Sequence, residues 1–568
     1  MRKNFWSKSL LLGLMLSIGQ VVFAQDLKND NGYKAQLAAV ESQLKKGDIA
    51  SALAIIEETL QQYPNGSDLY YAKSLLYAQV RNFDVAIPAA EQAVEKSPEN
   101  MLYKNHLLEL YKASEDYEDA IVFLDKLIAD QKDNPQLYRE KIMLMHSAKL
   151  SLEALKVYDE TKAKFGVSDT LDVLKAEILM DLDRPREAAE ALKPWREKKT
   201  QIRQVYSSLS YVYVDASNFK DALAVLEEGL QNSKDDLLYL DLADAYLAQK
   251  KSKPAYESLK KAFESETVNY FDKHRAMFKV MNEPADFSID QKQELANLLV
   301  LKYPRIADSH MFKGDVLWQK GEMDQARSLY LTAVAMQPQL IDAWRKLVNI
   351  DLAMNKVSLA ITDGMEGLQR HPGNVMLSYF IGVAHMMKKD HAEARKFLEA
   401  ALDRSVNDDP MVQSMIYSSL GDLYNELKLY AESDVAYEEA IKLDSANTNA
   451  MNNYAYYLSL RKEKLDKAAK YAEQANKLEK NSGTFQDTYA WVLFQQAKYK
   501  EALYWIELAL KNSETSATLL DHYGDILIQL GRSKEAVKQW ERALSMTNKG
   551  SVDVDKLKKK ISEKKYID

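Results

Sequence analysis

The sequence contains no cysteine, and glycine and proline are scarce. Without cysteine the chain can form neither disulfides nor cysteine zinc sites, and it has no thiol nucleophile. Glycine (18) and proline (12) make up 30 of the 568 residues, less than half of their combined share of roughly 12 % in average proteins. This composition leaves little room for glycine-rich nucleotide loops or for many hairpin turns. The net charge of −8 shows no excess of basic residues, which argues against a nucleic-acid-binding protein.

The first 24 residues have the pattern of a targeting segment. A short apolar run follows the basic residues Arg2, Lys3 and Lys8, and Ala24 ends the segment. A membrane-spanning helix needs about 20 apolar residues, and this run is shorter. We therefore expect a signal peptide that is cleaved after Ala24, with an uncleaved anchor as the alternative. The mature chain is then expected to be exported, to the periplasm or to the periplasmic face of an outer membrane.

A period of 34 residues runs through the rest of the sequence. Prolines repeat it from Pro64 to Pro98 and from Pro338 to Pro372. Small and large apolar residues within each period follow helical spacings, so each unit is predicted to form two helices separated by a turn. Alanines mark the same position in two series, namely Ala52, Ala86, Ala120, Ala154, Ala188, Ala222 and Ala255, then Ala326, Ala360 and Ala394.

One unit of the second series illustrates the pattern. Gly314 lies on the predicted first helix and Gly321 marks the turn, while Ala326 and Tyr330 share one stripe of the second helix. Small residues at the crossing point allow the two backbones to approach closely, and the large residue fills the gap between neighbouring units. In a later unit Ser433 replaces the second-helix alanine, which predicts looser packing there.

This pattern resembles the tetratricopeptide-repeat family, whose unit is a helix–turn–helix of 34 residues. The resemblance implies an all-α solenoid, a right-handed superhelix of stacked helix pairs with the first helices on the concave side. About 14 units can be counted, so the resemblance covers nearly the whole chain after Ala24. The units begin near residues 33, 67, 101, 135, 169, 203, 236, 307, 341, 375, 414, 448, 483 and 517.

The chain between and after the two arrays departs from the pattern. Two helical stretches are expected between them, the second starting with a capping box of Ser288 and Gln291. Residues 283–286 are the expected loop or hinge. The whole segment, residues 270–306, is interpreted as a degenerate repeat that joins the arrays, with a true domain linker as the alternative. The last segment is interpreted as a capping helix rather than a basic membrane- or phosphate-binding patch. The predicted organisation is residues 1–24 signal peptide, 25–269 N-terminal array, 270–306 degenerate repeat or hinge, 307–547 C-terminal array and 548–568 capping helix and tail.

Motifs for chemistry are missing. The sequence contains no GxxxxGK[ST], GxGxxG, GxSxG or HExxH pattern. His385 and His391 are six residues apart, which is a poor spacing for two metal ligands on one helix. We therefore expect no enzymatic activity, no cofactor and no metal site, and an enzyme with catalytic residues hidden among the helices is only a third hypothesis.

The resemblance further implies that first-helix side chains not used for packing point into a groove. Aromatic rings beside amides and carboxylates suit an extended peptide, and the aspartates among them would prefer a basic ligand. This differs from the basic carboxylate clamp of family members that hold acidic peptide ends. The alternative is that the rings only pack between helices. The candidate groove residues are Trp318, Arg345, Tyr379, Asn449, Asn452, Tyr456, Asp487, Trp491, Asp521 and Asp525.

The sequence thus predicts a binding protein. We expect a non-enzymatic scaffold in the cell envelope that binds protein or peptide partners in its groove, and association with outer-membrane complexes is a further expectation. No nucleic-acid partner is expected. The alternative is a glycan-binding protein associated with the outer membrane, in which groove aromatics stack on sugar rings.

Overall fold

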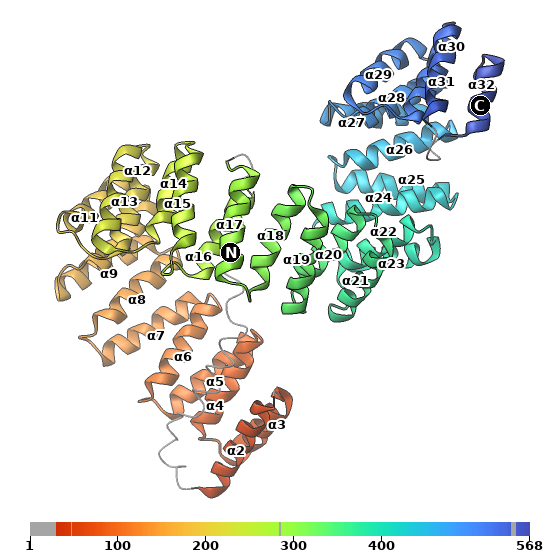
Figure 1. Ribbon diagram of the computed structural model, residues 1–568. Helices are drawn as coiled ribbons and strands as arrows, with labels where there is room; N and C mark the ends of the chain where they lie inside the picture. Colours follow the sequence, from red (N-terminus) through yellow and green to blue (C-terminus); the bar gives the residue numbers. More distant parts are fainter. Residues whose placement is uncertain (1–29, 47, 283–285, 547–551) are drawn as a thin grey trace. The chain divides into compact units, whose positions relative to one another are not determined.

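The computed structural model describes residues 30–46, 48–282, 286–546 and 552–568. In this part of the chain the secondary structure is helical and contains no β-strand (Figure 1). The predicted all-α fold is therefore confirmed. The expected signal peptide lies outside the described residues, as do residues 283–285 of the expected hinge. No helix among the described residues is long and apolar enough to cross a membrane.

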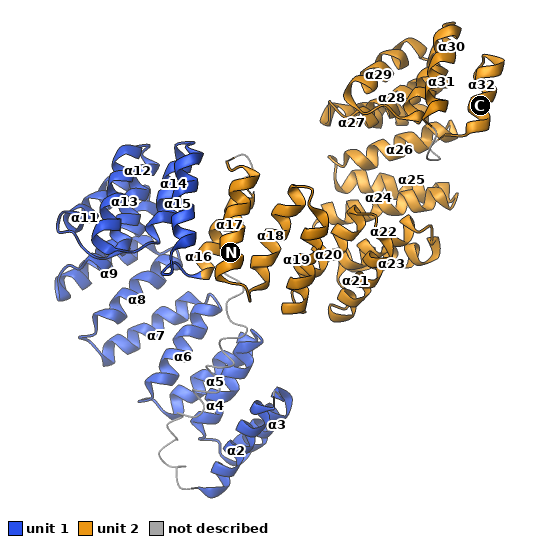
Figure 2. Cartoon of the chain, viewed as in Figure 1, with its two compact units in different colours: residues 1–269 blue, residues 270–568 orange. Residues whose placement is uncertain are grey.

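The chain divides into two compact units, residues 1–269 and 270–568 (Figure 2). Helices alternate through unit 1 as first and second members of pairs, and the even-numbered ones are the first helices. They are α2 (Asn31–Lys45), α3 (Ile49–Gln62), α4 (Ser67–Gln79), α5 (Phe83–Lys96), α6 (Met101–Ala113), α7 (Tyr117–Asp130), α8 (Pro135–Ser147), α9 (Ser151–Phe165), α10 (Asp169–Asp181), α11 (Pro185–Glu197), α12 (Arg203–Asp215), α13 (Phe219–Ser233), α14 (Leu238–Ala248) and α15 (Ser252–Glu264).

Unit 2 continues the alternation and ends with one extra helix. A short 3-10 helix, Ser405–Asn407, lies between α23 and α24. The helices are α16 (Tyr270–Asn282), α17 (Ile289–Lys302), α18 (Ala307–Gln319), α19 (Met323–Met336), α20 (Ile341–Ala353), α21 (Val357–Arg370), α22 (Val375–Met387), α23 (His391–Arg404), α24 (Pro410–Glu426), α25 (Tyr430–Leu443), α26 (Thr448–Arg461), α27 (Leu465–Leu478), α28 (Gly483–Gln495), α29 (Tyr499–Asn512), α30 (Ala517–Gln529), α31 (Ser533–Ser545) and α32 (Val554–Glu563).

The predicted unit starts agree with the first helices. Most coincide with the first residue of an even-numbered helix, and the predictions at 33, 236 and 414 are displaced by two to four residues. The segment predicted as a degenerate repeat forms the helix pair α16 and α17, and Ser288 and Gln291 make the expected capping box of α17. The resulting stack of helix pairs is the predicted solenoid.

The period also appears in the backbone of the turns. The residue that separates the two helices of a pair is left-handed in unit after unit, for example Arg81 (φ 59°), Glu115 (φ 64°) and Lys149 (φ 66°). Gly321, with φ 81°, occupies the same turn in its unit, as predicted. A left-handed residue lets the amide that follows it bond back to a carbonyl near the end of the first helix, as in the bond from the Asn82 amide to the Tyr77 carbonyl (3.0 Å). The turn geometry is therefore kept even where the residue is not glycine.

Each pair packs through small residues, as the alanine series predicts. All ten alanines of the two series are fully buried. A side chain added at Gly314 would meet the ring of Tyr330 at 2.6 Å, so the glycine allows close contact within one pair rather than between neighbouring units. Ser433 is buried, and its hydroxyl donates to the Gly421 carbonyl at 2.8 Å. The looser packing expected at this serine is therefore wrong.

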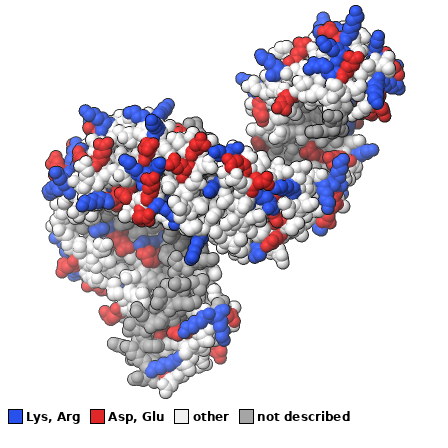
Figure 3. All heavy atoms as spheres, viewed as in Figure 1, with Lys and Arg blue, Asp and Glu red and all other residues white. Residues whose placement is uncertain are grey.

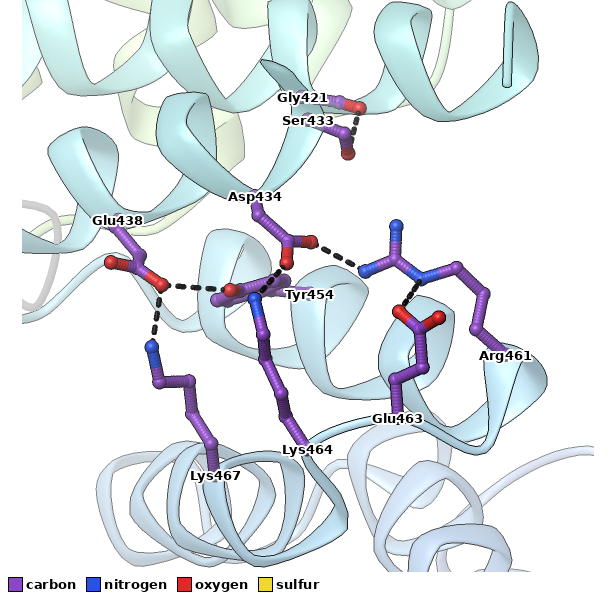
Figure 4. A network of polar contacts seen from close by, with 9 residues as sticks. All are labelled: Gly421, Ser433, Asp434, Glu438, Tyr454, Arg461, Glu463, Lys464 and Lys467. Atoms are coloured by element: carbon purple, nitrogen blue, oxygen red, sulfur yellow. Dashed lines mark hydrogen bonds and ion pairs between the residues drawn. The ribbon is translucent and has the colours of Figure 1, made fainter. Parts of the chain in front are cut away.

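Ion pairs join α25 to the region of α26 and α27, where the turn between these two helices is lengthened (Figure 4). Lys464 and the residue two before it are both left-handed, with φ 46° and 55°. Their turn brings Arg461 and Lys464 to the carboxylate of Asp434 on α25, while Lys467 pairs with Glu438 at 2.5 Å. These contacts join α25 to the next pair and hold the register of the stack.

Helix α32 covers the end of unit 2. Leu557 is buried in a cluster with Leu520, Leu527 and Trp540 of the last pair, while Lys558 stays exposed. An apolar inner face with a polar outer face is what the end of a repeat array requires. The predicted capping helix is confirmed.

Candidate partner-binding surfaces

Successive first helices pack side by side within each unit. In unit 1, α8, α10, α12 and α14 contact one another in order, and in unit 2 the same holds from α20 to α30. Because one face of each first helix contacts its own second helix and the flanks contact neighbouring first helices, the remaining face forms a continuous surface along the unit. This surface, here called the first-helix face, is where the predicted groove residues were placed.

The ten predicted groove residues differ in their solvent exposure. Seven remain accessible at least in part, while three are buried, with 6 % exposure for Asn452, 7 % for Trp491 and 1 % for Asp525. The prediction that these three point into a groove is wrong. Asn449 is exposed, and the half-buried residues are Trp318, Arg345, Tyr379, Tyr456, Asp487 and Asp521.

The half-buried side chains already have neighbours in the chain. Trp318 lies edge-on to the ring of Tyr330, with 6.4 Å between centroids. The Tyr379 hydroxyl and the Ser419 hydroxyl are hydrogen-bonded at 3.2 Å. Their contribution to partner binding stays a prediction.

Trp491 is part of a stacked cluster between first helices. Its ring lies 4.1 Å from the ring of His522 on α30 and 4.8 Å from that of Phe494, nearly parallel to both. His522 is paired with Asp487 at 2.8 Å. Burial alone would lower the pKa of His522, but Asp487, together with the nearby aspartates of α30, reverses this and raises it. The packing alternative is therefore what the structure shows for Trp491.

The acidic residues of α30 are also engaged from within the chain. The Lys560 ammonium of α32 donates to Asp521 and to Asp525, both at 2.7 Å, and Lys560 itself is 2 % exposed. The indole of Trp540 donates to Asp525 at 3.2 Å. Burial, and the charge of Asp521, raise the pKa of Asp525 to about 7, while Lys560 opposes this shift. The predicted preference of these aspartates for a basic ligand is met by Lys560.

The same arrangement joins earlier pairs of unit 2. Asp315 accepts from the Tyr330 hydroxyl at 2.7 Å and from Lys346 of the next first helix at 2.8 Å. Asp422 accepts from Tyr437 at 2.5 Å and from the next first helix at 3.2 Å. Each aspartate lies fifteen residues before its aromatic partner, as Asp525 does before its tryptophan. This spacing is a sequence signal for a joint between repeats, and α32 takes the place of a further first helix.

Unit 1 contains a groove that the sequence analysis did not predict. Its volume is about 630 Å³, within the range of roughly 300–1,000 Å³ usual for ligand sites. Four consecutive first helices, α8, α10, α12 and α14, supply its walls. The lining residues are His146, Ala176, Glu177, Met180, Asp181, Ser207, Ser208, Ser210, Tyr211, Val212, Val214, Asp241, Asp244 and Ala245.

The unit-1 groove is acidic. Four carboxylates line it, and none of its lining residues is a lysine or an arginine. Burial, and the neighbouring charge of Asp181, raise the pKa of Glu177. Asp181 lies 3.4 Å from His146, and Ser207 donates to Asp241 at 2.7 Å. The groove therefore combines negative charge with hydroxyl groups and partly apolar walls.

A sequence signal for the unit-1 groove exists in the repeat register. Glu177, Tyr211 and Asp244 are 34 and 33 residues apart, so they occupy one repeat position on successive first helices. The period therefore aligns them on the first-helix face.

Charged side chains elsewhere are mixed in sign. Figure 3 shows lysine and arginine interspersed with aspartate and glutamate over the visible face. Among the described residues, no group of three or more histidine and carboxylate side chains is placed to hold a metal ion.

These features define a helical-repeat protein with binding surfaces on its first helices. A tetratricopeptide-repeat family model matches residues 71–136, 293–341 and 346–410, and a second tetratricopeptide-repeat model matches residues 416–447. Tetratricopeptide repeats are therefore detected in these parts of the chain, and stacked helical repeats of this kind are suited to binding other proteins.

Two curated relatives are similar to the chain. BBSome complex member BBS4 of Bos taurus is 22 % identical over 404 residues, covering 69 % of this chain and 75 % of the relative. The protein of the same description from Mus musculus is 24 % identical over 278 residues, covering 48 % of this chain and 51 % of the relative. The chain thus matches about half of the length of the mouse relative.

Two solved structures are also similar. The APC/C hetero-tetramer Cut9–Hcn1 matches with a TM-score of 0.41 and 14 % identity, covering 88 % of this chain and 96 % of that one. A tetratricopeptide repeat protein from Parabacteroides merdae matches with a TM-score of 0.35 and 16 % identity, covering 45 % of this chain and 98 % of that one.

Proposed function

We propose that this chain is a non-enzymatic scaffold that binds segments of other proteins along its first-helix faces. The observation that carries the proposal is the unit-1 groove, a concave surface built by four first helices in a chain of tetratricopeptide repeats. Stacked repeats present extended surfaces that bind through shape and many weak contacts. The description of the curated relatives as members of a complex supports a role in assembly.

The proposal places the scaffold in the cell envelope, exported and associated with outer-membrane complexes. The basic start and short apolar run of residues 1–24 support export. Fractionation of cells that produce the full chain, followed by N-terminal sequencing, tests this placement. We expect an envelope-associated protein that begins at Gln25, and a protein with an intact N-terminus in the cytosol would refute export.

The glycan-binding alternative receives no support from Trp491. Its ring is 7 % exposed and stacks on His522 and Phe494, so it cannot stack on a sugar without rearrangement.

Photo-cross-linking from matched positions tests the scaffold. Tyr211 on the first helix α12 and Tyr504 on the second helix α29 are both 62 % exposed, so each can be replaced by a photoreactive phenylalanine derivative with little effect on packing. Asn449 offers an exposed first-helix position in unit 2. We expect specific protein adducts from Tyr211 and Asn449 and few from Tyr504. Equal adducts from all three positions, or none, would contradict binding on the first-helix faces.

A further inference from the structure

The acidic residues of the unit-1 groove and those at the end of unit 2 differ in their ion pairs. In unit 2, the predicted acidic residues Asp521 and Asp525 are neutralised by the buried Lys560. In the groove, Glu177 is exposed and forms no ion pair with any residue that the structure describes. The groove therefore offers a carboxylate that no lysine or arginine of the described residues neutralises.

We propose that the unit-1 groove binds an extended protein segment in which lysine or arginine alternates with apolar side chains. This inference rests on the proposed function and names the chemical class of the partner. The carboxylate of Glu177 supplies charge that a cationic segment would neutralise, while Asp181 and Asp241 already lie 3.4 Å from His146 and 3.8 Å from Arg203. The residues that line the groove include no lysine or arginine to oppose such a segment.

The apolar part of the walls indicates a peptide rather than a small cation. Tyr211 lines the groove and is 62 % exposed, and Met180 and Val214 line it as well. Exposed aromatic rings are common anchors of protein interfaces, because they bury a large area at low entropic cost. A polyamine would satisfy the carboxylates but would leave this apolar surface exposed to water.

The serine hydroxyls complete the complementarity. Ser207 and Ser208 line the groove between the charged residues of α10 and those of α14. A hydroxyl can donate to a backbone carbonyl or accept from a backbone amide, which an extended segment presents at every residue.

The spacing of the helices sets the length of the segment. Packed helices lie about 8–10 Å apart, so four first helices span roughly 24–30 Å. An extended chain rises about 3.3 Å per residue, and about seven to nine residues therefore cross the groove. Alternating side chains of such a segment point to opposite sides, so that charged and apolar residues can meet different walls.

Binding of a defined peptide to the purified full chain tests the proposal. The probe is a fluorescein-labelled peptide of nine residues, in which lysine alternates with valine or alanine, measured by fluorescence anisotropy in 50 mM and 300 mM salt. A peptide with glutamate in place of lysine is the control ligand. We expect saturable binding of the lysine peptide that weakens at high salt, because the ion pairs of an open groove are screened.

Two pairs of variants locate the binding. Glu177→Gln with Asp181→Asn removes two groove charges, and Glu153→Gln with Glu190→Gln removes two exposed charges on the second helices α9 and α11. We expect about tenfold weaker binding for the first pair, equivalent to about 1.4 kcal/mol, and no change for the second. Circular dichroism confirms that both variants fold.

The contribution of the Tyr211 ring to peptide binding is tested in the same way. Tyr211→Ala should weaken the lysine peptide by at least threefold, whereas Tyr504→Ala, which removes an equally exposed ring from a second helix, should not. Spermine is the small-cation competitor. If spermine displaces the peptide at similar concentration and Tyr211→Ala has no effect, the groove binds small cations and the peptide assignment is wrong.

Two further results would overturn the inference. These are an absence of saturable binding by the lysine peptide, or equal binding by the two charge variants. If first-helix cross-links still capture partner proteins in either case, the scaffold stands and only the chemical class of partner is wrong. If the lysine peptide binds selectively but no protein is cross-linked at Tyr211 or Asn449, the groove remains a peptide-binding surface and the scaffold function fails.

Discussion

Lys560 provides a sharp test of how the repeat array is closed. Its ammonium is buried and contacts two carboxylates, of which Asp525 is only 1 % exposed. Lys560→Ala leaves Asp525 buried without its cation. Removal of one partner of a buried ion pair costs about 3–5 kcal/mol, so we expect α32 to lose its attachment to the last helix pair.

Hydrogen exchange followed by mass spectrometry measures this loss locally. Unfolding at the end of a repeat array need not involve the rest of the chain, so a global unfolding midpoint would average the effect. Each factor of ten in an opening equilibrium corresponds to about 1.36 kcal/mol. We therefore expect amides of α30 and α31 to exchange about a hundred- to several-thousand-fold faster in Lys560→Ala.

The effect should depend on pH, because Asp525 is an acid whose pKa is raised in the folded chain. Its folded pKa of about 7 lies above the ordinary value of 3.8, so its ionisation favours unfolding as pH rises through this window. Replacing Lys560 removes a charge that holds the pKa of Asp525 down against the effects of burial and of Asp521. The variant should therefore be closest to the parent chain near pH 5 and most destabilised above pH 7.

Matched variants separate charge from packing. Lys558→Ala removes an exposed lysine of the same helix and should leave exchange unchanged. Lys560→Met with Asp525→Asn removes both charges and should recover much of the protection, because no buried ion is left unpaired. If Lys560→Ala and Lys558→Ala exchange alike at pH 7.5, the buried ion pair does not hold α32 in place.

Two other predictions follow from the packing. Gly314→Ala would place a carbon 2.6 Å from the buried ring of Tyr330, so we expect a local loss of about 1–3 kcal/mol, seen as faster hydrogen exchange in α18 and α19, and unchanged exchange in these helices would contradict the close contact. Burial lowers the pKa of His106 to about 4, so stability should fall as pH drops from about 6.5 toward 4, because the unfolded chain binds the proton first. His106→Gln should flatten this part of the pH profile, and an equally steep profile would show that another group is responsible.

Much of the fold could be predicted because one local rule repeats along the chain. The alanines spaced by 34 residues mark a position that must be small wherever two helices cross, and all ten in the two series are buried. The starts of α4, α6, α8 and other first helices follow directly from this period. The boundaries differ where the spacing changes, as at α24, because a helix begins at its own cap, here Asp409, and not at a multiple of the period.

The candidate site was less predictable because burial depends on neighbours. Trp491 and Asp525 each lie eight residues after the start of their helix and are buried, whereas Glu177 and Tyr211 are exposed at the same position of α10 and α12. Helical spacing identifies such a face, but it does not say whether another helix covers it. Lys560 lies 35 residues after its partner Asp525, and only the arrangement of α32 against α30 makes them a pair.

The unit-1 groove shows what the repeat register adds. Glu177, Tyr211 and Asp244 share one repeat position, but a tyrosine separates the two acids, so a search for a run of like residues misses them. The alignment of units places them on one face, and the structure shows that this face is hollow. Alignment of first helices by register, before side chains are compared, is therefore the useful step for sequences of this kind.

A hydrogen-exchange footprint of the purified chain in complex with a protein captured by cross-linking would test the central claim most directly. The account predicts that added protection concentrates on exposed residues of even-numbered helices, with α10, α12 and α14 of unit 1 among them. Protection confined to the odd-numbered second helices, with the unit-1 groove unchanged, would contradict it.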